Sequence, residues 1–161
     1  NVPQNTKIHI DLKAVEKLKK TSNIVGIKDS SGNWDYLQEL ILAFQDEFFK
    51  VFVGNAKNLY AAYTAGAAGS ITPVSNLDPK AETVMYDNIV NGDLIQALEN
   101  QKRALKIASL FEYEGLPVCV KAKAAMALMG LCKNRNLKPL PQVASKDIEE
   151  VKNVLLELGL L

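Results

Sequence analysis

The stretch NIVGIKDSSG at residues 23–32 decides how the rest of the chain is interpreted. An apolar run ends in Lys28 and turn-forming residues follow at once, which is typical of a buried strand that runs into a loop. Because strand side chains alternate between two faces, Ile24, Gly26 and Lys28 are expected on one face. Desolvation there would lower the lysine pKa and leave an amine that can attack a ketone. The alternative is a strand-end lysine that reaches solvent, which is the commoner fate of lysine.

Two further strands are predicted, at residues 49–53 and 69–74. Apolar spacing predicts short amphipathic helices over residues 11–20, 34–44 and 59–65. Alternating strands and helices at this spacing indicate parallel β-α-β units of an α/β protein. Three parallel strands do not make a complete sheet, so we expect more strands upstream or from another chain. A (β/α)8 barrel would provide them.

The pattern changes after Pro79, where the strands stop. Helices are expected over residues 80–90, 93–111, 118–131 and 146–158, with a break at residues 114–117, Ser145 as N-cap and Gly159 as the final stop. We therefore interpret residues 1–78 as the C-terminal portion of a (β/α)8 barrel, from the end of strand five through strand eight. Residues 79–161 would be the final barrel helix and a C-terminal three-helix region. The chain begins at Asn1 within an apparent loop, which suggests a fragment or processed product.

Composition narrows the class of protein. The chain has 161 residues and a formal net charge of +1, so nothing favours nucleic acid or an anionic membrane as a partner. No segment has the length of a membrane span or the pattern of a signal peptide, and a cytoplasmic protein is expected. Cys119 and Cys132 are predicted to be core thiols in a reducing compartment. With one histidine, a zinc site is not expected.

Four segments resemble the dihydrodipicolinate synthase / N-acetylneuraminate lyase family. Residues 24–32 resemble its Schiff-base lysine strand, and residues 1–3 resemble the Tyr-Asn-x-Pro motif at the end of its fifth strand. Residues 66–76 resemble its eighth strand, and residues 116–130 its C-terminal helices. The resemblance covers the whole chain in order. It implies a barrel followed by a three-helix domain, and a homotetramer.

The resemblance also implies a chemistry. In that family a lysine, here Lys28, condenses with the ketone of pyruvate or of a related 2-oxo acid, and no metal or organic cofactor takes part. The family's proton-relay tyrosine would immediately precede Asn1. Ile71 matches a residue whose main-chain carbonyl lies near the nucleophile. The positions that match residues near the far end of the substrate are Gly54, Asn55 and Thr72.

Asn5 bears on the choice of substrate. By the resemblance, dihydrodipicolinate synthases carry an arginine at this position, where it binds the carboxylate of aspartate semialdehyde through two parallel hydrogen bonds. Residues 2–6 and 54–56 are more similar to 4-hydroxy-2-oxoglutarate and 2-keto-3-deoxy-sugar-acid aldolases. We therefore favour an aldolase acting on a 2-oxo acid and keep the synthase as an alternative.

Two hypotheses in which this chain is not a catalyst by itself stay open. The first is a catalytically incomplete half-barrel that associates with a partner chain. The second is a small open α/β domain that binds a ligand between its strand ends. Among the other polar residues, Asp29 is expected to face away from Lys28 and cap the next helix, and Trp34 to pack. Lys121 and Lys123 are expected on a solvated or interface face.

Overall fold

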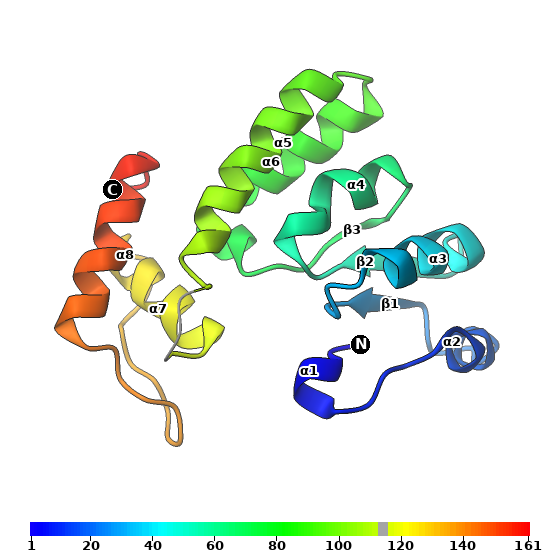
Figure 1. Ribbon diagram of the computed structural model, residues 1–161, viewed down its shortest axis with the longest axis horizontal. Coiled ribbons are helices and arrows are strands. Elements are labelled where there is room, and N and C mark those ends of the chain that lie inside the picture. The colour runs from blue at the N-terminus through cyan, green and yellow to red at the C-terminus, as the bar shows by residue number, and fades with distance from the viewer. Residues whose placement is uncertain (113–115) are drawn as a thin grey trace.

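The computed structural model describes residues 1–112 and 116–161, so part of the predicted break at residues 114–117 lies outside the described residues. Its centre is a parallel sheet of three strands, β1 (Gly26–Asp29), β2 (Lys50–Val53) and β3 (Gly69–Ser70), in the order β1-β2-β3. Figure 1 shows a helical hairpin on one side of the sheet and a separate pair of helices near the C-terminus. The predicted parallel sheet is confirmed.

Helices occupy most of the remaining chain. They are α1 (Pro3–Thr6), α2 (Leu12–Lys19), α3 (Trp34–Phe44), α4 (Leu59–Thr64), α5 (Pro79–Val90), α6 (Leu94–Ser109), α7 (Val118–Leu128) and α8 (Ser145–Glu157), with 3-10 turns η1 (Ala56–Asn58) and η2 (Val74–Asn76). Each predicted helix forms, with ends displaced by less than one turn. The single turn α1 was not predicted, and it begins at a proline, which suits a first helical position. None of the described helices is long and apolar enough to span a membrane.

The core lies between the sheet and the helices that cover one of its faces. Val51 and Val53 of β2 are fully buried, as are Leu40 of α3 and Leu59 of α4. Trp34 packs against this cluster, as predicted. Apolar side chains buried in this way supply most of the favourable free energy of folding. The opposite face of the sheet carries Lys28.

The third strand is shorter than predicted. We expected residues 69–74, but β3 contains only Gly69 and Ser70. The amide of Ile71 still donates to the carbonyl of Val53 at 2.9 Å. Pro73 then has no amide hydrogen to donate, and the chain turns into η2.

Three predictions for the C-terminal region are wrong: the N-cap of the last helix, the burial of the cysteines and the exposure of Lys121. Ser145 is the first residue of α8, and Ala144 occupies the N-cap position, whereas Gly159 does end the helix with a φ of 65°. Cys119 and Cys132 are exposed, not core thiols. Lys121 is instead buried at 1% exposure, and its Nζ donates to the carbonyl of Phe111 at 3.2 Å.

A buried glutamine joins the helical hairpin to the segment that follows β2. The side-chain amide of Gln101 on α6 donates to the carbonyl of Ala56 at 2.9 Å. Its Oε1 accepts from the amide of Tyr60 at 2.8 Å. One side chain thus satisfies two backbone groups of the η1–α4 segment, which begins directly after Gly54 and Asn55.

Candidate active site

Lys28 lies near the C-terminal end of β1, on the face of the sheet opposite the core. In the register of the sheet, Lys28 is level with Phe52 of β2, and Phe52 with Gly69 of β3. Residues level with one another in a parallel sheet share a face, so these three lie together. The neighbouring row, Asp29, Val53 and Ser70, belongs to the core face. The predicted alternation is confirmed, and Lys28 is partly buried.

Gly54 leaves the space that the Lys28 side chain occupies. A Cβ built on Gly54 would come within 3.0 Å of Lys28 Cε, of Ser30 Oγ and of the carbonyl oxygen of Asp29. Real side chains do not approach so closely, so only glycine lets Lys28 and Ser30 lie across this position. The structure therefore brings Gly54, predicted as a site residue, against Lys28, the candidate nucleophile.

Ser30 is a site residue that we did not predict. Its Oγ is buried, and within the described residues it makes no hydrogen bond. Buried hydroxyls are nearly always paired, so an unpaired one beside a candidate nucleophile marks a place for a polar group of a ligand. The sequence did hold a signal, because Ser30 is two residues beyond Lys28 and alternation places both on one face.

Asp29 points away from Lys28, as predicted, but it does not cap a helix. Its Oδ1 accepts from Asn1 Nδ2 at 2.7 Å and its Oδ2 accepts from Ser31 Oγ at 2.8 Å. The cap of α3 is Asn33, whose Oδ1 accepts from the amide of Tyr36 at 3.2 Å. Asn33 is the correct distance from the helix start to reach a free amide, and Asp29 is not.

Asn1 continues the sheet beyond β1. Its main-chain nitrogen donates to the carbonyl of Lys28 at 2.8 Å, and its carbonyl accepts from the amide of Ser30 at 2.9 Å. This pair of hydrogen bonds is the pattern of neighbouring parallel strands. The backbone around Lys28 is thus held from both sides, by β2 and by Asn1.

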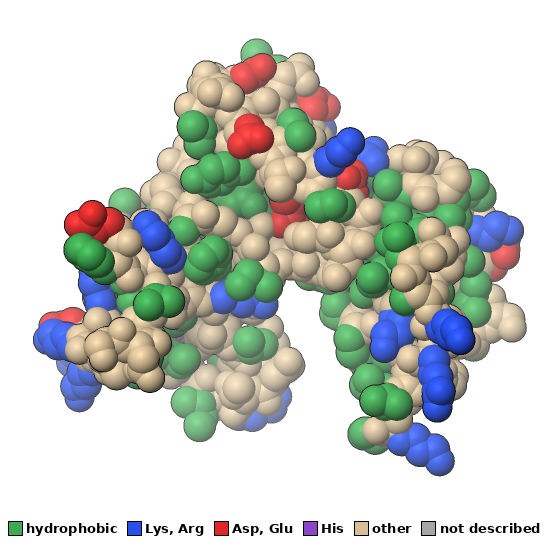
Figure 2. Space-filling view, turned by 180° about the vertical axis from the view of Figure 1, so that it is seen from behind, with side chains coloured by type: hydrophobic (Ala, Val, Ile, Leu, Met, Phe, Trp, Pro, Cys, Tyr) green, Lys and Arg blue, Asp and Glu red, His purple; other side chains and the backbone are tan. Residues whose placement is uncertain are grey.

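A cleft opens beside the C-terminal ends of the strands. Its volume is about 740 Å³, and it is lined by Asn5 of α1, by Pro73 and Asn76 after β3, and by residues of α7 that include Cys119 and Lys123. Figure 2 shows the hollow between the N-terminal elements and the lobe formed by α7 and α8. Asn5 therefore lines the region at the carboxyl ends of the strands, where barrel enzymes bind substrates.

Of the remaining predicted residues, Ile71 and Asn55 lie on the side of Lys28 and Thr72 does not. Ile71 is 54% exposed, and its side chain lies on the Lys28 face. Asn55 caps η1, where its Oδ1 accepts from the amide of Lys57 at 2.9 Å. A Cβ on Gly32 would lie 3.2 Å from Asn55 Nδ2, so the loops after β1 and β2 are adjacent. Thr72 lies on the other face, buried, with its hydroxyl bound to Glu82 of α5. The structure does not bring Thr72 to Lys28.

The sequence model described as "Dihydrodipicolinate synthetase family" matches residues 1–158 of the chain. The chain belongs to this family. The 4-hydroxy-tetrahydrodipicolinate synthase of Methanococcoides burtonii is 34% identical over 162 residues, which are 100% of this chain and 55% of that protein. The chain thus spans about half the length of the curated relatives it matches.

Two solved structures of family members match the whole chain. The dihydrodipicolinate synthase of Thermotoga maritima matches with a TM-score of 0.90 at 28% identity, over 100% of this chain and 55% of that one. The chloride-inhibited synthase of Acinetobacter baumannii, complexed with pyruvate, matches with a TM-score of 0.89 at 27% identity, over 100% and 54%. The sheet and helices are therefore part of a (β/α)8 barrel with its C-terminal helices.

Within residues 1–112 and 116–161, no group of three or more histidine, cysteine or acidic side chains could hold a metal ion. The polar groups at the strand ends are an amine, a hydroxyl and amides, which suit covalent attachment and hydrogen bonding to a carbonyl compound.

Replacing Ser30 by alanine tests its place in the site. We expect the free energy of unfolding to stay within about 0.5 kcal/mol or to rise, because a buried unpaired hydroxyl contributes no hydrogen bond. Urea unfolding measures this. The same variant should bind a 2-oxo acid more weakly, so that a higher pyruvate concentration gives half-maximal reductive trapping. A clear loss of stability would show that the hydroxyl is bonded within the protein.

We expect the protein to lose stability in alkali because the pKa of Tyr36 is raised in the folded state. Its hydroxyl donates to the carbonyl of Ile10, and burial, followed by the negative charges of Asp29 and Asp11, raises the pKa of Tyr36 to about 12 from 10.0. An unfolded chain releases this proton near pH 10, so the stabilising contribution is complete below pH 10 and is lost as pH rises towards 12. Urea midpoints between pH 8 and 12 should fall less steeply for Tyr36→Phe than for Tyr60→Phe, which removes another phenol.

Proposed function

We propose that the protein is the Lys28-bearing part of a Schiff-base carbon–carbon lyase that acts on pyruvate or a 2-oxo-3-deoxy acid. The observation that carries the proposal is the position of Lys28: near a strand end, on the free face of the sheet, across a glycine and beside an unpaired hydroxyl. The pyruvate complex of the Acinetobacter baumannii relative supports a 2-oxo acid as substrate.

The Lys28 amine attacks the ketone carbon, and loss of water gives an iminium. The iminium accepts the electron pair of a breaking C–C bond and becomes an enamine, with an aldehyde released; in the opposite direction, the enamine attacks an aldehyde. A proton added to the enamine carbon restores an iminium, and addition of water to that iminium frees the 2-oxo acid and the lysine. Each step uses only the amine, protons and water, so no redox partner is needed.

The other site residues have roles that follow from position. Ser30 would donate its hydroxyl hydrogen to an oxygen of the bound acid, and Gly54 would keep the space open. The main-chain carbonyl of Ile71, directly after β3, would orient the reacting amine. Asn55 stays a prediction for the far end of the substrate. Thr72, directed at Glu82, would support the strand end instead.

Dihydrodipicolinate synthesis is a second candidate reaction. The curated relatives from Brachyspira hyodysenteriae, Methanococcoides burtonii and Archaeoglobus fulgidus are 4-hydroxy-tetrahydrodipicolinate synthases, which favours this reaction. Asn5 opposes it, because a neutral amide does not offer the paired, charged donors by which arginine binds a carboxylate. Turnover with pyruvate plus aspartate semialdehyde, compared with cleavage of 4-hydroxy-2-oxoglutarate, would decide between the two in the complete enzyme.

A second candidate function for this chain is that of a catalytically incomplete half-barrel, which associates with the rest of a barrel. A sheet of three parallel strands leaves edges open, and the chain spans about half the length of its relatives. We infer little turnover by the chain alone, a homotetramer for the complete enzyme and a cytoplasmic location. Sedimentation equilibrium tests the association of this chain, since a well-behaved monomer would count against association through open strand edges.

Borohydride reduction in the presence of pyruvate, followed by peptide mapping, tests the main proposal. We expect a pyruvyl adduct on the peptide that contains Lys28. An adduct that forms only when the complementary part of a barrel is supplied would place the activating surroundings of the amine in that part. An adduct in neither case would refute Schiff-base chemistry and leave the half-barrel candidate.

A further inference from the structure

A second cavity lies at the outer edge of the sheet. Its volume is about 280 Å³, and its lining includes Tyr63 of α4, Ser70 of β3, and Glu82, Tyr86 and Asp87 of α5. This cavity shares no lining residue with the cleft beside Asn5, and Ser70 lies on the core face of the sheet, so the cavity is separate from that cleft. None of its lining residues has a place in the proposed reaction.

Glu82 is a buried carboxylate at the wall of this cavity, with 3% exposure. Its two oxygens accept hydrogen bonds from the hydroxyls of Ser70 and Thr72. The hydroxyl of Tyr63 donates in turn to Ser70 Oγ at 2.6 Å. Two side-chain hydroxyls therefore donate to one carboxylate and a third donates to one of them, and each carboxylate oxygen keeps capacity for a further donor.

The charge of Glu82 has no cationic partner within the described residues. The salt bridges within residues 1–112 and 116–161 all involve carboxylates other than Glu82. The charged residues that line the cavity, Glu82 and Asp87, are both acidic. Glu82 lies in the first turn of α5, where the helix dipole favours a negative charge, but that dipole amounts to only about half an elementary charge. A buried carboxylate of this kind is costly unless a cation pairs with it.

The aromatic lining suits a cation as well. The rings of Tyr63 and Tyr86 meet edge to face, with centroids 5.3 Å apart and planes at 88°. Tyrosine ring faces attract ammonium and guanidinium groups. Burial raises the pKa of Tyr63 to about 12, and the negative charge of Glu82 adds to this effect, so the phenol stays protonated and continues to donate to Ser70.

We propose that this cavity binds the side chain of a lysine or arginine carried by the polypeptide segment that pairs with the free edge of β3, with Glu82 as its ionic partner. β3 pairs with β2 along one edge, and the chain spans about half the length of its relatives, so the segment that pairs with the other edge comes from outside this chain. The proposal rests on the partial-barrel assignment and not on the chemistry of Lys28.

A pair of isosteric probes tests the cavity in the 161-residue chain. n-Propylguanidinium is a cation and n-propylurea is its neutral counterpart. Titration of protein labelled with ¹³C in its tyrosine rings should shift Tyr63 and Tyr86 with n-propylguanidinium, at constant ionic strength. n-Propylurea should bind at least about tenfold more weakly, because it lacks the charge-assisted hydrogen bond.

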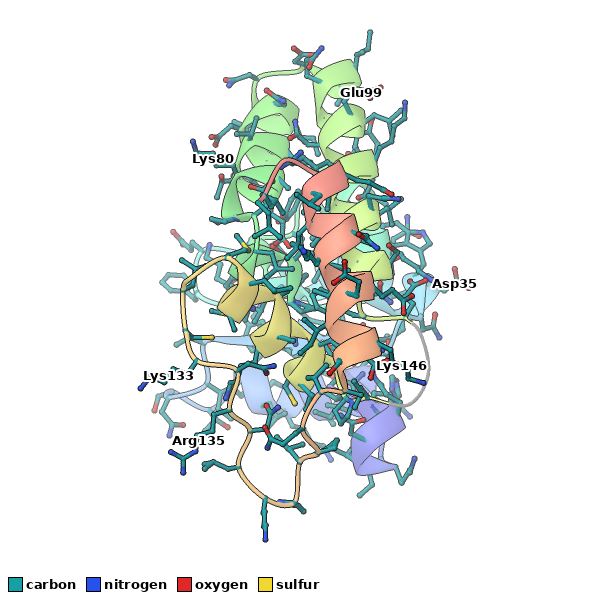
Figure 3. The ribbon with its side chains drawn as sticks, turned by 90° about the vertical axis from the view of Figure 1, so that its left-hand side faces the viewer. Asp35, Lys80, Glu99, Lys133, Arg135 and Lys146 are labelled. Carbon is teal, nitrogen blue, oxygen red and sulfur yellow. The ribbon has the colours of Figure 1, made fainter. Side chains whose placement is uncertain are left out.

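Variants assign the effect to one carboxylate. Glu82→Gln keeps the shape and the acceptor but removes the charge, and it should reduce guanidinium binding about tenfold or more. Glu99→Gln removes an equal charge from the exposed surface of α6 and should leave binding unchanged (Figure 3). Equal binding of the two probes by the wild-type chain, or no shift of the two rings, would overturn the proposal without any variant. Pyruvate trapping on Lys28 should persist in Glu82→Gln, which separates failure here from failure of the proposed function.

Discussion

Replacing Lys28 by arginine should reduce the borohydride-stable pyruvate adduct on this chain to background. Arginine keeps the positive charge and much of the length of lysine. Its guanidinium is not deprotonated in proteins, so it offers no free electron pair to a ketone. Intact-mass spectrometry after reduction measures the adduct, and urea unfolding verifies that the variant remains folded.

Lys50→Arg is the matched control for this substitution. Lys50 lies on β2, level with Gly26 and therefore on the same face as Lys28, but at the other end of the sheet. Catalytic groups of a barrel lie at the carboxyl ends of its strands. The adduct should persist in Lys50→Arg at the wild-type level. A Lys28→Arg chain that still forms the adduct would assign the nucleophile to another amine.

Replacing Gly54 by alanine should both destabilise the chain and displace the nucleophile. The new Cβ would overlap Lys28 Cε, Ser30 Oγ and a backbone oxygen. Two of these atoms belong to side chains that can move, but the carbonyl of Asp29 also accepts the amide of Gly54 at 2.7 Å and cannot move freely. Overpacking of this kind costs about 1–3 kcal/mol. Urea unfolding should show that loss, and reductive trapping should fall because Lys28 no longer reaches its position.

Gly69→Ala is the matched control, on the same face of the sheet and two strands from Lys28. A Cβ at Gly69 would meet the ring of Phe52 at 3.4 Å, which is an ordinary contact. We expect this variant to unfold within about 0.5 kcal/mol of the wild type and to keep its adduct. If both alanine variants behaved alike, the space over Gly54 would have no special role.

Local sequence pattern was sufficient to predict much of the fold and the position of Lys28. Alternation along residues 23–28 placed Lys28 on the correct face, and apolar spacing found the helices, because both signals depend on neighbours in sequence. The same alternation continues after β3. Ile71 and Thr72 are adjacent, so their side chains face opposite sides of the sheet, and only the side chain of Ile71 could share the face of Lys28. Thr72 was included by resemblance and is directed at Glu82.

Tertiary contacts account for what sequence could not show. Whether Cys119 and Lys121 are buried depends on where α8 and the segment near Phe111 pack. Residue type suggests a buried cysteine and an exposed lysine, but in the structure the cysteine is exposed and the lysine is buried. The unpaired hydroxyl of Ser30 and the carboxylate of Glu82 are defined by atoms from distant elements. No periodicity reports which donors a polar group will find after folding.

The glutamine bridge from α6 has a consequence for how this site could evolve. The nitrogen of the Gln101 side-chain amide donates to the carbonyl of Ala56, and its oxygen accepts from the amide of Tyr60. Since the loop with Gly54 and Asn55 runs directly into that segment, its shape is set in part by a residue more than forty positions later. The loop and the helical hairpin must therefore be inherited together: a loop grafted from a relative without its matching α6 would lose the amide that holds it in register.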